Sequence, residues 1–298
     1  MQRNLQYLLI LVALGLPGIA HTQEPIAVPL PNPAPTYNPI PTTPSPLSTA
    51  AVLPSGQMRE AVEPPWQPCD YRSSWYTRVE YFHWNERANG ADFVNEHGAL
   101  TTLGYVHRFG RERVRAEVFG GSVDYRGGAQ YDDGTNVPLK AITNYLGAKT
   151  ELEVLAEPDS IPWLTFVGGV GSRFWFRDLA DGWDDSGGYV QGYQETWWTL
   201  YPYIGIEKRR QPYDGWELYG STRIGITAIT YNHATFDDSI VYPRLGVTSL
   251  SEFGIRGSHF QLGSTCELFT WSASASARGS YQPASNMLLI GLKTGWMF

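Results

Sequence analysis

The sequence has few cysteines, no long apolar segment and no excess of positive charge. Two of its 298 residues are cysteine, which excludes a scaffold held together by many disulfides. After the N-terminal region, no stretch approaches the roughly 18 consecutive apolar residues of a membrane-spanning helix, so a helical membrane protein is excluded. The net charge of −7 and the pI of about 5.4 argue against a general affinity for nucleic acid, and no nucleic-acid partner is expected.

Several common enzyme motifs are also missing. The sequence contains no Gly-Lys-Ser phosphate loop, no His-Glu-x-x-His zinc motif and no Gly-x-Ser-x-Gly nucleophile elbow. The acidic sets Asp181–Asp185 and Asp237-Asp238 carry ligands suited to a divalent cation, but their spacing fits no calcium loop. We interpret them as solvated loops and expect neither a metal nor another cofactor.

The two cysteines, Cys69 and Cys266, can pair in an oxidising compartment. However, Cys266 alternates with Phe260, Leu262 and Leu268, which predicts that it faces lipid in the middle of a strand. Cys69 precedes the predicted strands. These positions favour two unpaired thiols.

Aromatic residues and glycine are abundant. Aromatics make up 14% of the chain, with 11 Trp and 18 Tyr, and there are 31 Gly. Membrane β-barrels carry girdles of aromatic side chains at both interfaces, and tight strand packing accommodates small residues. The composition is therefore typical of such a barrel.

The N-terminal region has the pattern of an exported protein. Arg3 supplies a positive start, residues 8–16 form an apolar run, and Gly18 and Ala20 are small residues at the cleavage positions. From residue 21 to 74 the chain is rich in proline, and a segment of this composition cannot bury a hydrophobic core. We predict a signal peptide at 1–20, a disordered periplasmic linker at 21–74 and a β-barrel at 75–298.

The last thirteen residues alternate in character. Counting back from Phe298, every second residue is apolar or aromatic except Thr294, whereas the opposite face includes Lys293. This period of two predicts a strand with one apolar face. The ending resembles the closing strand of bacterial outer-membrane barrels. The resemblance implies that Phe298, with Trp296, is an assembly signal read by the outer-membrane assembly machinery.

The sequence from Trp75 onward divides into ten predicted strands. They cover residues 75–87, 97–110, 112–126, 139–154, 161–178, 189–208, 215–232, 244–257, 259–275 and 286–298. Short connections alternate with longer polar ones at 88–96, 127–138, 179–188, 233–243 and 276–285. Short turns at one end and long loops at the other are typical of a transmembrane barrel.

The apolar and charged residues of these strands occupy opposite faces. Val118 alternates with Glu117, Ile224 with Arg223 and Leu152 with Glu151. Alternation alone does not say which face points inward, but the export signal, the aromatic ending and the strand length favour a barrel with its apolar face outward. The predicted fold class is an all-β, antiparallel, up-and-down transmembrane barrel of about ten strands in the outer-membrane lipids of a Gram-negative-type bacterium.

The predicted inward face carries charges of both signs. A ten-stranded barrel is narrow enough for side chains to fill, and enclosed charges must be paired. We therefore predict a filled, ion-paired lumen. Its charged residues are Arg78, Glu80, Arg115, Glu117, Lys149, Glu151, Glu207, Arg223, Glu267 and Lys293.

Five short segments form a pattern: Glu86-Arg87 at the end of the first strand, RGGAQYDD at 126–133, YPYIGIE at 201–207, His233 after the seventh strand, and the GLKTGWMF ending. Together they resemble the omptins, ten-stranded outer-membrane endopeptidases with a site in a cleft at the extracellular rim. The resemblance implies that a water molecule is activated between an Asp-His couple and an aspartate pair.

Laid onto this chain, the family pattern is only partly retained. Asp132 matches the first aspartate, while the second falls on Gly134, beside Asp133. His233 matches the base, but its orienting aspartate falls on Tyr231. Asp237 or Asp238 can replace that aspartate only if the loop folds back.

Glu86 matches a residue that selects basic substrates, but the carboxylate that would accompany it falls on Ile229. A lipopolysaccharide site would need basic residues on the outer wall, where only Arg173 and Arg177 come into consideration.

Three functions follow as hypotheses. The first is a structural or surface-interaction role through the extracellular loops, with an extracellular protein or peptide as partner. The second is an omptin-like endopeptidase that uses Asp132, Asp133 and His233, with Glu86, Asp237 and Asp238 at the substrate. The third is a small pore.

Overall fold

The computed structural model describes residues 72–88, 91–130, 136–161, 163–213, 215–236, 238–276 and 281–298. These residues form strands and their connections, and no helix among them is long and apolar enough to cross a membrane. The strands are β1 (Ser73–Ala88), β2 (Ala91–Phe109), β3 (Glu112–Gln130), β4 (Asn136–Ala156), β5 (Leu164–Leu179), β6 (Gly182–Asp184), β7 (Tyr189–Val190), β8 (Tyr193–Tyr213), β9 (Trp216–Ile226), β10 (Ile229–Ala234), β11 (Ser239–Val241), β12 (Val247–Arg256), β13 (Phe260–Trp271) and β14 (Ala284–Met297).

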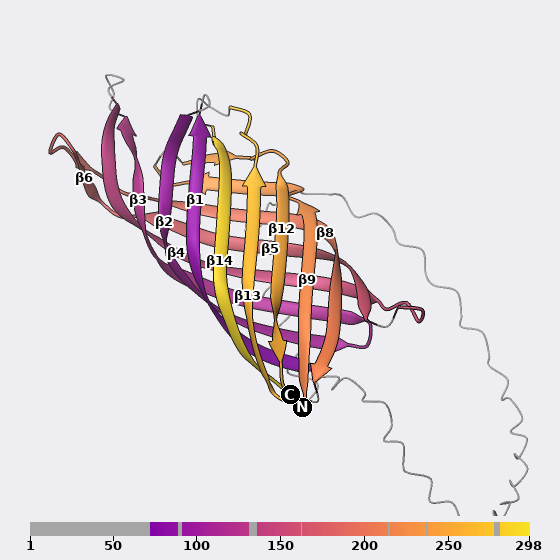
Figure 1. Ribbon diagram of the computed structural model, residues 1–298. Helices are drawn as coiled ribbons and strands as arrows, with labels where there is room; N and C mark the ends of the chain where they lie inside the picture. The colour runs from indigo at the N-terminus through magenta and orange to yellow at the C-terminus, as the bar shows by residue number, and fades with distance from the viewer. Residues whose placement is uncertain are drawn as a thin grey trace, which may run out of the picture. The chain divides into compact units, whose positions relative to one another are not determined.

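The long strands close into one antiparallel barrel (Figure 1). Neighbours in sequence pair with one another around the wall, and β14 pairs with β1 from Ser74↔Met297 to Arg87↔Ala284. The predicted ten-stranded wall is therefore confirmed, with β9 and β10 sharing one position in it. The short strands β6, β7 and β11 extend the sheet at one end. We call this the long-connection end, and the end that holds Ser73 and Phe298 the short-turn end.

Some predicted boundaries were wrong. Much of the predicted loops 88–96 and 127–138 is strand, because β1 and β2 pair as far as Ala88↔Ala91 and β3 and β4 as far as Gln130↔Asn136. The short connection expected between the predicted strands 189–208 and 215–232 lies largely inside β8. The polar residues in these segments alternate less clearly and were therefore assigned to loops. Backbone pairing nevertheless continues through them once the register of the hairpin is set.

The predicted seventh strand is interrupted at residues 227 and 228. Pairing with β8 passes from Tyr203↔Gly225 to Leu200↔Ile229, so this wall position holds one residue more than the facing part of β8. Such an insertion is a β-bulge. Before it the odd-numbered residues face inward, and after it the even-numbered residues do. The exchange is visible in the burial: Arg223 is buried before the bulge, and Asn232 is buried after it.

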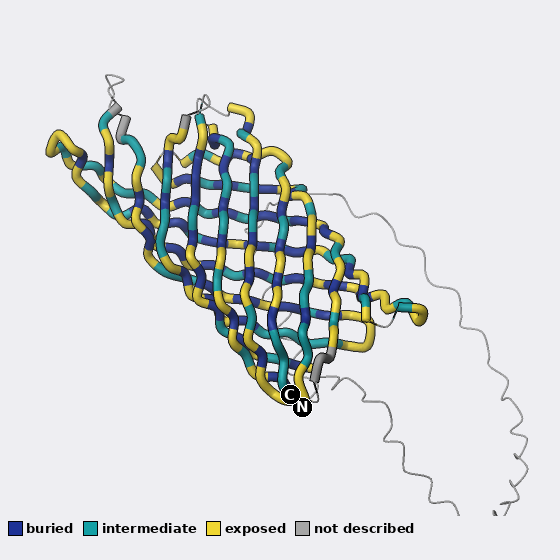
Figure 2. The backbone as a smooth tube through the Cα atoms, in the orientation of Figure 1, coloured by how far each residue is buried: buried dark blue, intermediate teal, exposed yellow. Residues whose placement is uncertain are grey.

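The barrel is apolar outside and charged inside. Leu292, Ile224 and Val118 are 68%, 58% and 54% exposed, whereas Glu151 and Arg223 are 2% and 3% exposed. Figure 2 shows buried and exposed residues alternating along the wall strands. Cys266, on β13, is free and exposed on the outer face as predicted, while Cys69 lies outside the described residues.

The predicted charged residues are buried in the lumen, where they form ion pairs. Lys149 Nζ lies 2.5 Å from Glu267, 3.2 Å from Glu151 and 3.7 Å from Glu117. Lys293 Nζ donates to Glu252 at 2.7 Å. Because a buried charge without a partner is costly, this network is a condition for closing the wall around these residues.

The strands are longer than a bilayer crossing requires. β4 and β8 each contain 21 residues, which corresponds to about 70 Å along the strand and about 50 Å along the axis of a barrel tilted by about 45°. The hydrocarbon core is only about 30 Å thick. On the outer face of β3 the apolar residues are followed by Ser122, Asp124 and Arg126 toward the long-connection end. The membrane belt therefore surrounds the part of the wall nearer the short-turn end.

We predict that Leu292→Arg destabilises the barrel in lipid by about 2–4 kcal/mol, because it places a charge on the lipid-facing wall. Urea unfolding of the refolded protein in vesicles measures the loss. The matched control is Asn144→Arg, on the polar part of the outer wall, where a cost of about 0–1 kcal/mol is expected. Equal costs would contradict the assignment of the membrane belt.

Candidate functional site at the long-connection end

Four tryptophans close the lumen on the side of the long-connection end. Trp84, Trp175, Trp197 and Trp271 come from β1, β5, β8 and β13 and are at most 2% exposed. Every pair of rings lies within 6.4 Å between centroids, and Trp175 stacks on Trp197 at 5.3 Å. Because these strands lie around the circumference of the wall, the tryptophan cluster crosses the lumen and fills it.

Next to the tryptophan cluster, one arginine binds three glutamates. Arg177 lies 2.7 Å from Glu96, 2.9 Å from Glu195 and 3.4 Å from Glu86. The indole N–H of Trp84 donates to Glu86 at 2.9 Å. We call Arg177, Glu86, Glu96 and Glu195 the arginine centre. Its guanidinium occupies the position between the carboxylates that a basic ligand would need, so the chain itself supplies the cation for these three glutamates.

Other groups hold the remaining carboxylate oxygens of this centre. The indole N–H of Trp197 donates to Glu195 at 2.8 Å, and Thr143 Oγ1 donates to Glu96 at 2.9 Å. Tyr145 Oη also donates to Glu96. The polar tips of the aromatic residues therefore satisfy the carboxylates while their rings fill the lumen.

Glu86 stays a predicted substrate residue, but its surroundings are those of a buried structural group. Its side chain is 4% exposed and bound to Trp84 and Arg177. The outer-wall lipopolysaccharide site considered for Arg173 and Arg177 is wrong. Both side chains are about 2% exposed and point into the lumen, because they share the strand face of Trp175.

His233 and Asp238 form a hydrogen-bonded couple. The loop after β10 folds back through Asp238, whose φ of 51° is left-handed, and His233 Nε2 lies 2.9 Å from Asp238 Oδ1. However, His233 pairs with Thr196 on β8, whose inward neighbours are Glu195 and Trp197. Residues directly opposite in a sheet share a face. The couple therefore lies on the outer face of the wall, and Glu86 faces the lumen.

Three predicted site residues, Asp132, Asp133 and Asp237, lie outside the described residues. In the DGWDD segment, Asp184 is used to hold the β6–β7 hairpin: it accepts from Ser186 N and Gly188 N, both at 2.8 Å. Asp181 accepts from Gly192 N, which lowers the pKa of its carboxyl. Across the described ranges, no group of three or more His, Cys, Asp or Glu side chains is arranged to hold a metal ion.

Sequence reasoning missed the tryptophan cluster, although a signal for it was present. Trp175 stands between Arg173 and Arg177 at spacings of two, and Trp197 follows Glu195 at the same spacing. Side chains two apart in a strand share a face. The charged residues thus identify these tryptophans as inward-facing. The sequence analysis assigned the aromatic residues to girdles on the outer face and therefore did not predict them in the lumen.

The comparisons with known proteins find only distant similarity. No protein-family model and no curated protein matches the chain. Among solved structures, the outer membrane protease OmpT from Escherichia coli has 10% identity, with 77% of this chain and 97% of that chain covered and a TM-score of 0.44. The beta domain of the Bordetella autotransporter BrkA has 11% identity, with 76% and 99% covered and a TM-score of 0.40.

Ail, the attachment invasion locus protein of Yersinia pestis, has 10% identity, with 76% of this chain and 99% of that chain covered and a TM-score of 0.32. At these identities and TM-scores, none of the three proteins indicates what this chain does. The closed wall and its apolar exterior define the class by themselves: the chain is a β-barrel of the outer-membrane type, since a closed barrel leaves no strand edge unpaired in lipid.

We predict that Arg177→Leu destabilises the barrel by about 3–5 kcal/mol, because it leaves three buried carboxylates without their cation. Arg126→Leu, at an exposed position of the same end, should change stability by less than about 0.5 kcal/mol. Thermal unfolding in detergent, followed by circular dichroism, compares the two variants. A small effect of Arg177→Leu would mean that the arginine centre does not hold this end together.

Proposed function

We propose that the chain is a Gram-negative outer-membrane barrel that acts by surface interaction through its long-connection end, which faces the cell exterior. A filled lumen supports this role over conduction. Two closures lie in series, the ion-paired network and the tryptophan cluster. An ion would have to displace both, and each displacement leaves buried polar groups unpaired.

The single observation that carries the proposal is an exposed aromatic pair on a projecting hairpin. Trp183 and Tyr189 are 66% and 54% exposed, and their rings meet edge to face at 5.6 Å. They belong to β6 and β7, which extend outward from the wall beside β4 (Figure 1). Solvent-exposed Trp and Tyr are the side chains most enriched at the centres of protein interfaces.

Further exposed aromatic side chains lie near the same end. Phe236 follows β10, and Tyr242 follows β11. Asp184 pins the hairpin that presents Trp183, so little ordering is needed on binding. A rigid aromatic surface of this kind fits an extracellular protein or peptide.

A test uses a phage-displayed peptide library panned on the refolded, lipid-embedded protein. We expect enriched peptides to bind at least tenfold more weakly to a Trp183→Ala, Tyr189→Ala double variant, because aromatic anchors carry most of the binding energy at such surfaces. Trp216→Ala, at the short-turn end, is the control and should bind normally. Equal binding to the double variant would contradict the proposal.

For the pore hypothesis, we predict that planar bilayers containing the refolded protein show no single-channel steps. The Trp175→Ala variant should also show no steps. The substitution leaves a cavity in the tryptophan cluster, but the ion-paired network nearer the short-turn end still closes the lumen. Regular steps from the unaltered protein would show that the lumen opens and would contradict the closure described above.

The second candidate function is an omptin-like endopeptidase, which the 2.9 Å contact between His233 and Asp238 favours. An aspartate that holds the imidazole in one tautomer is what a histidine base requires. The outward orientation of His233 opposes it. We predict no cleavage of a basic peptide library by the refolded protein with lipid present. Cleavage that is lost in His233→Ala but kept in His97→Ala would establish the enzyme and overturn the surface-interaction role.

We also infer that Phe298 and Trp296 present the closing strand to the outer-membrane assembly machinery. Phe298 N donates to Ser73 O at 2.9 Å, and Ser73 N donates to Phe298 O at 3.1 Å. Both aromatic side chains are more than half exposed on the outer face. Export through the predicted signal peptide at 1–20 and a periplasmic linker at 21–74 belong to the same proposal.

A further inference from the structure

The short-turn end contains a cavity with several arginines in its lining. Its volume is about 250 Å³, and five arginines line it: Arg72, Arg108, Arg113, Arg209 and Arg256. They come from the residue before β1, from β2 and β3, and from β8 and β12 on the other side of the cavity. Among the described residues that line the cavity, Glu217 is the only acidic one.

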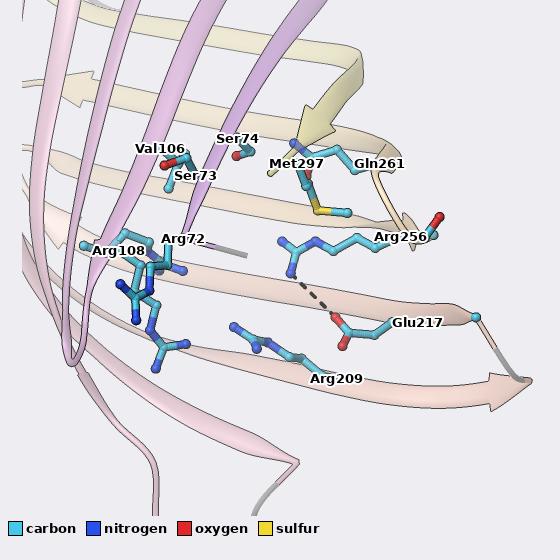
Figure 3. A pocket seen from close by; sticks show the side chains of 14 residues that line it. Arg72, Ser73, Ser74, Val106, Arg108, Arg209, Glu217, Arg256, Gln261 and Met297 are labelled. Atoms are coloured by element: carbon cyan, nitrogen blue, oxygen red, sulfur yellow. Dashed lines mark ion pairs between the residues drawn. The ribbon is translucent and has the colours of Figure 1, made fainter. Parts of the chain in front are cut away.

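The side chains converge on the cavity from both sides of the mouth. Figure 3 shows Arg209 and Arg256 reaching toward Arg72 and Arg108, with Glu217 beside Arg256. The side chains of Arg108, Arg209 and Arg256 are 17%, 29% and 28% exposed, so a solute can reach them. We call these four arginines and Arg113 the arginine mouth.

The carboxylates near the arginine mouth are already engaged. Arg113 binds both oxygens of Glu207, at 2.5 and 3.0 Å, and Arg223 binds the same residue at 2.9 Å. Arg209 approaches Glu207 only to 4.0 Å. Glu207 therefore supplies little compensation for the charge of Arg209. Arg108 pairs with Glu157 at 2.9 Å. Within the described ranges, the five lining arginines still outnumber the carboxylates that pair with them.

Arg256 is held in one orientation with bonding capacity left over. Its guanidinium lies 3.9 Å above the ring of Tyr219 and 3.6 Å from Glu217. Its Nε is buried and has no hydrogen-bond partner within the described part of the chain. A planar donor fixed by stacking needs little further ordering to bind an acceptor.

This accumulation of positive charge is exceptional in a chain with a net charge of −7. In the lumen above it, arginines and lysines are matched by glutamates, as in Lys293 with Glu252 and Arg223 with Glu153. If the arginines at the mouth served only the structure, the same matching would be expected there. Among the residues that the structure describes, Arg209 and Arg256 have only distant carboxylates, at 4.0 and 3.6 Å, which favours an added anion as their partner.

We propose that the arginine mouth is a binding site for an oxyanion, a phosphate or carboxylate group carried by a molecule on the periplasmic side. Guanidinium forks bind both groups through paired, charge-assisted hydrogen bonds. A cavity of about 250 Å³ holds a small group with two or more negative charges. This site is independent of the surface-interaction role proposed for the opposite end.

Isothermal titration of the refolded full chain in an uncharged detergent tests the proposal, with inorganic pyrophosphate and citrate as probes. We expect at least one probe to bind with a Kd below about 1 mM and to bind more weakly as sodium chloride is raised. Binding of pyrophosphate alone identifies a phosphate site, and binding of citrate alone identifies a carboxylate site.

The variants move the affinity in opposite directions. Arg209→Gln should weaken binding at least tenfold, and Glu217→Gln should tighten it several-fold because it removes the acidic lining residue. Arg256→Gln gives a second loss variant if Arg209→Gln fails to refold. Arg126→Gln, an exposed arginine at the opposite end, is the matched control and should leave the affinity unchanged. Failure of both probes to bind, or equal affinity in Arg209→Gln and Arg126→Gln, would overturn the proposal.

Discussion

The fold depends on the pairing of charges that the wall encloses. A barrel that turns its apolar strand faces toward lipid encloses its charged side chains, and a narrow interior excludes bulk water. Lys149 illustrates the constraint, since its ammonium is surrounded by Glu117, Glu151 and Glu267. Loss of any one member leaves the others buried without compensation, so the network acts as a unit. The wall, its register and its closure all have to be correct for these partners to meet.

The interior changes character along its axis. Ion pairs fill the part near the membrane belt, and the tryptophan cluster fills the part beyond it. The arginine centre joins the two kinds of packing, because the indoles of Trp84 and Trp197 donate to glutamates that also bind Arg177. Bulky rings fill the lumen at this level, so the wall there is a rigid support for the loops beyond it.

Much of the wall could be predicted from the sequence because alternation is a local property. The faces of Glu117 and Val118, or of Arg223 and Ile224, follow from their neighbours two residues away. Closure by the last strand was also predictable from its pattern. The side of the wall taken by His233 was not. It depends on one extra residue at 227–228, and Thr227 there is held by a hydrogen bond to Thr270 O, which is distant in sequence. A single-residue insertion leaves almost no trace in hydropathy.

The bulge has a consequence for how such proteins diversify. Removal of one codon at residue 228 would join Thr227, which is buried, to Ile229, which is exposed, and would restore regular alternation along the strand. Because pairing with β8 sets the faces of β10, Asn232 would still face the lumen and His233 the exterior. A codon gained or lost at this point is therefore absorbed locally, and the chemical inventory of the rim stays as it was.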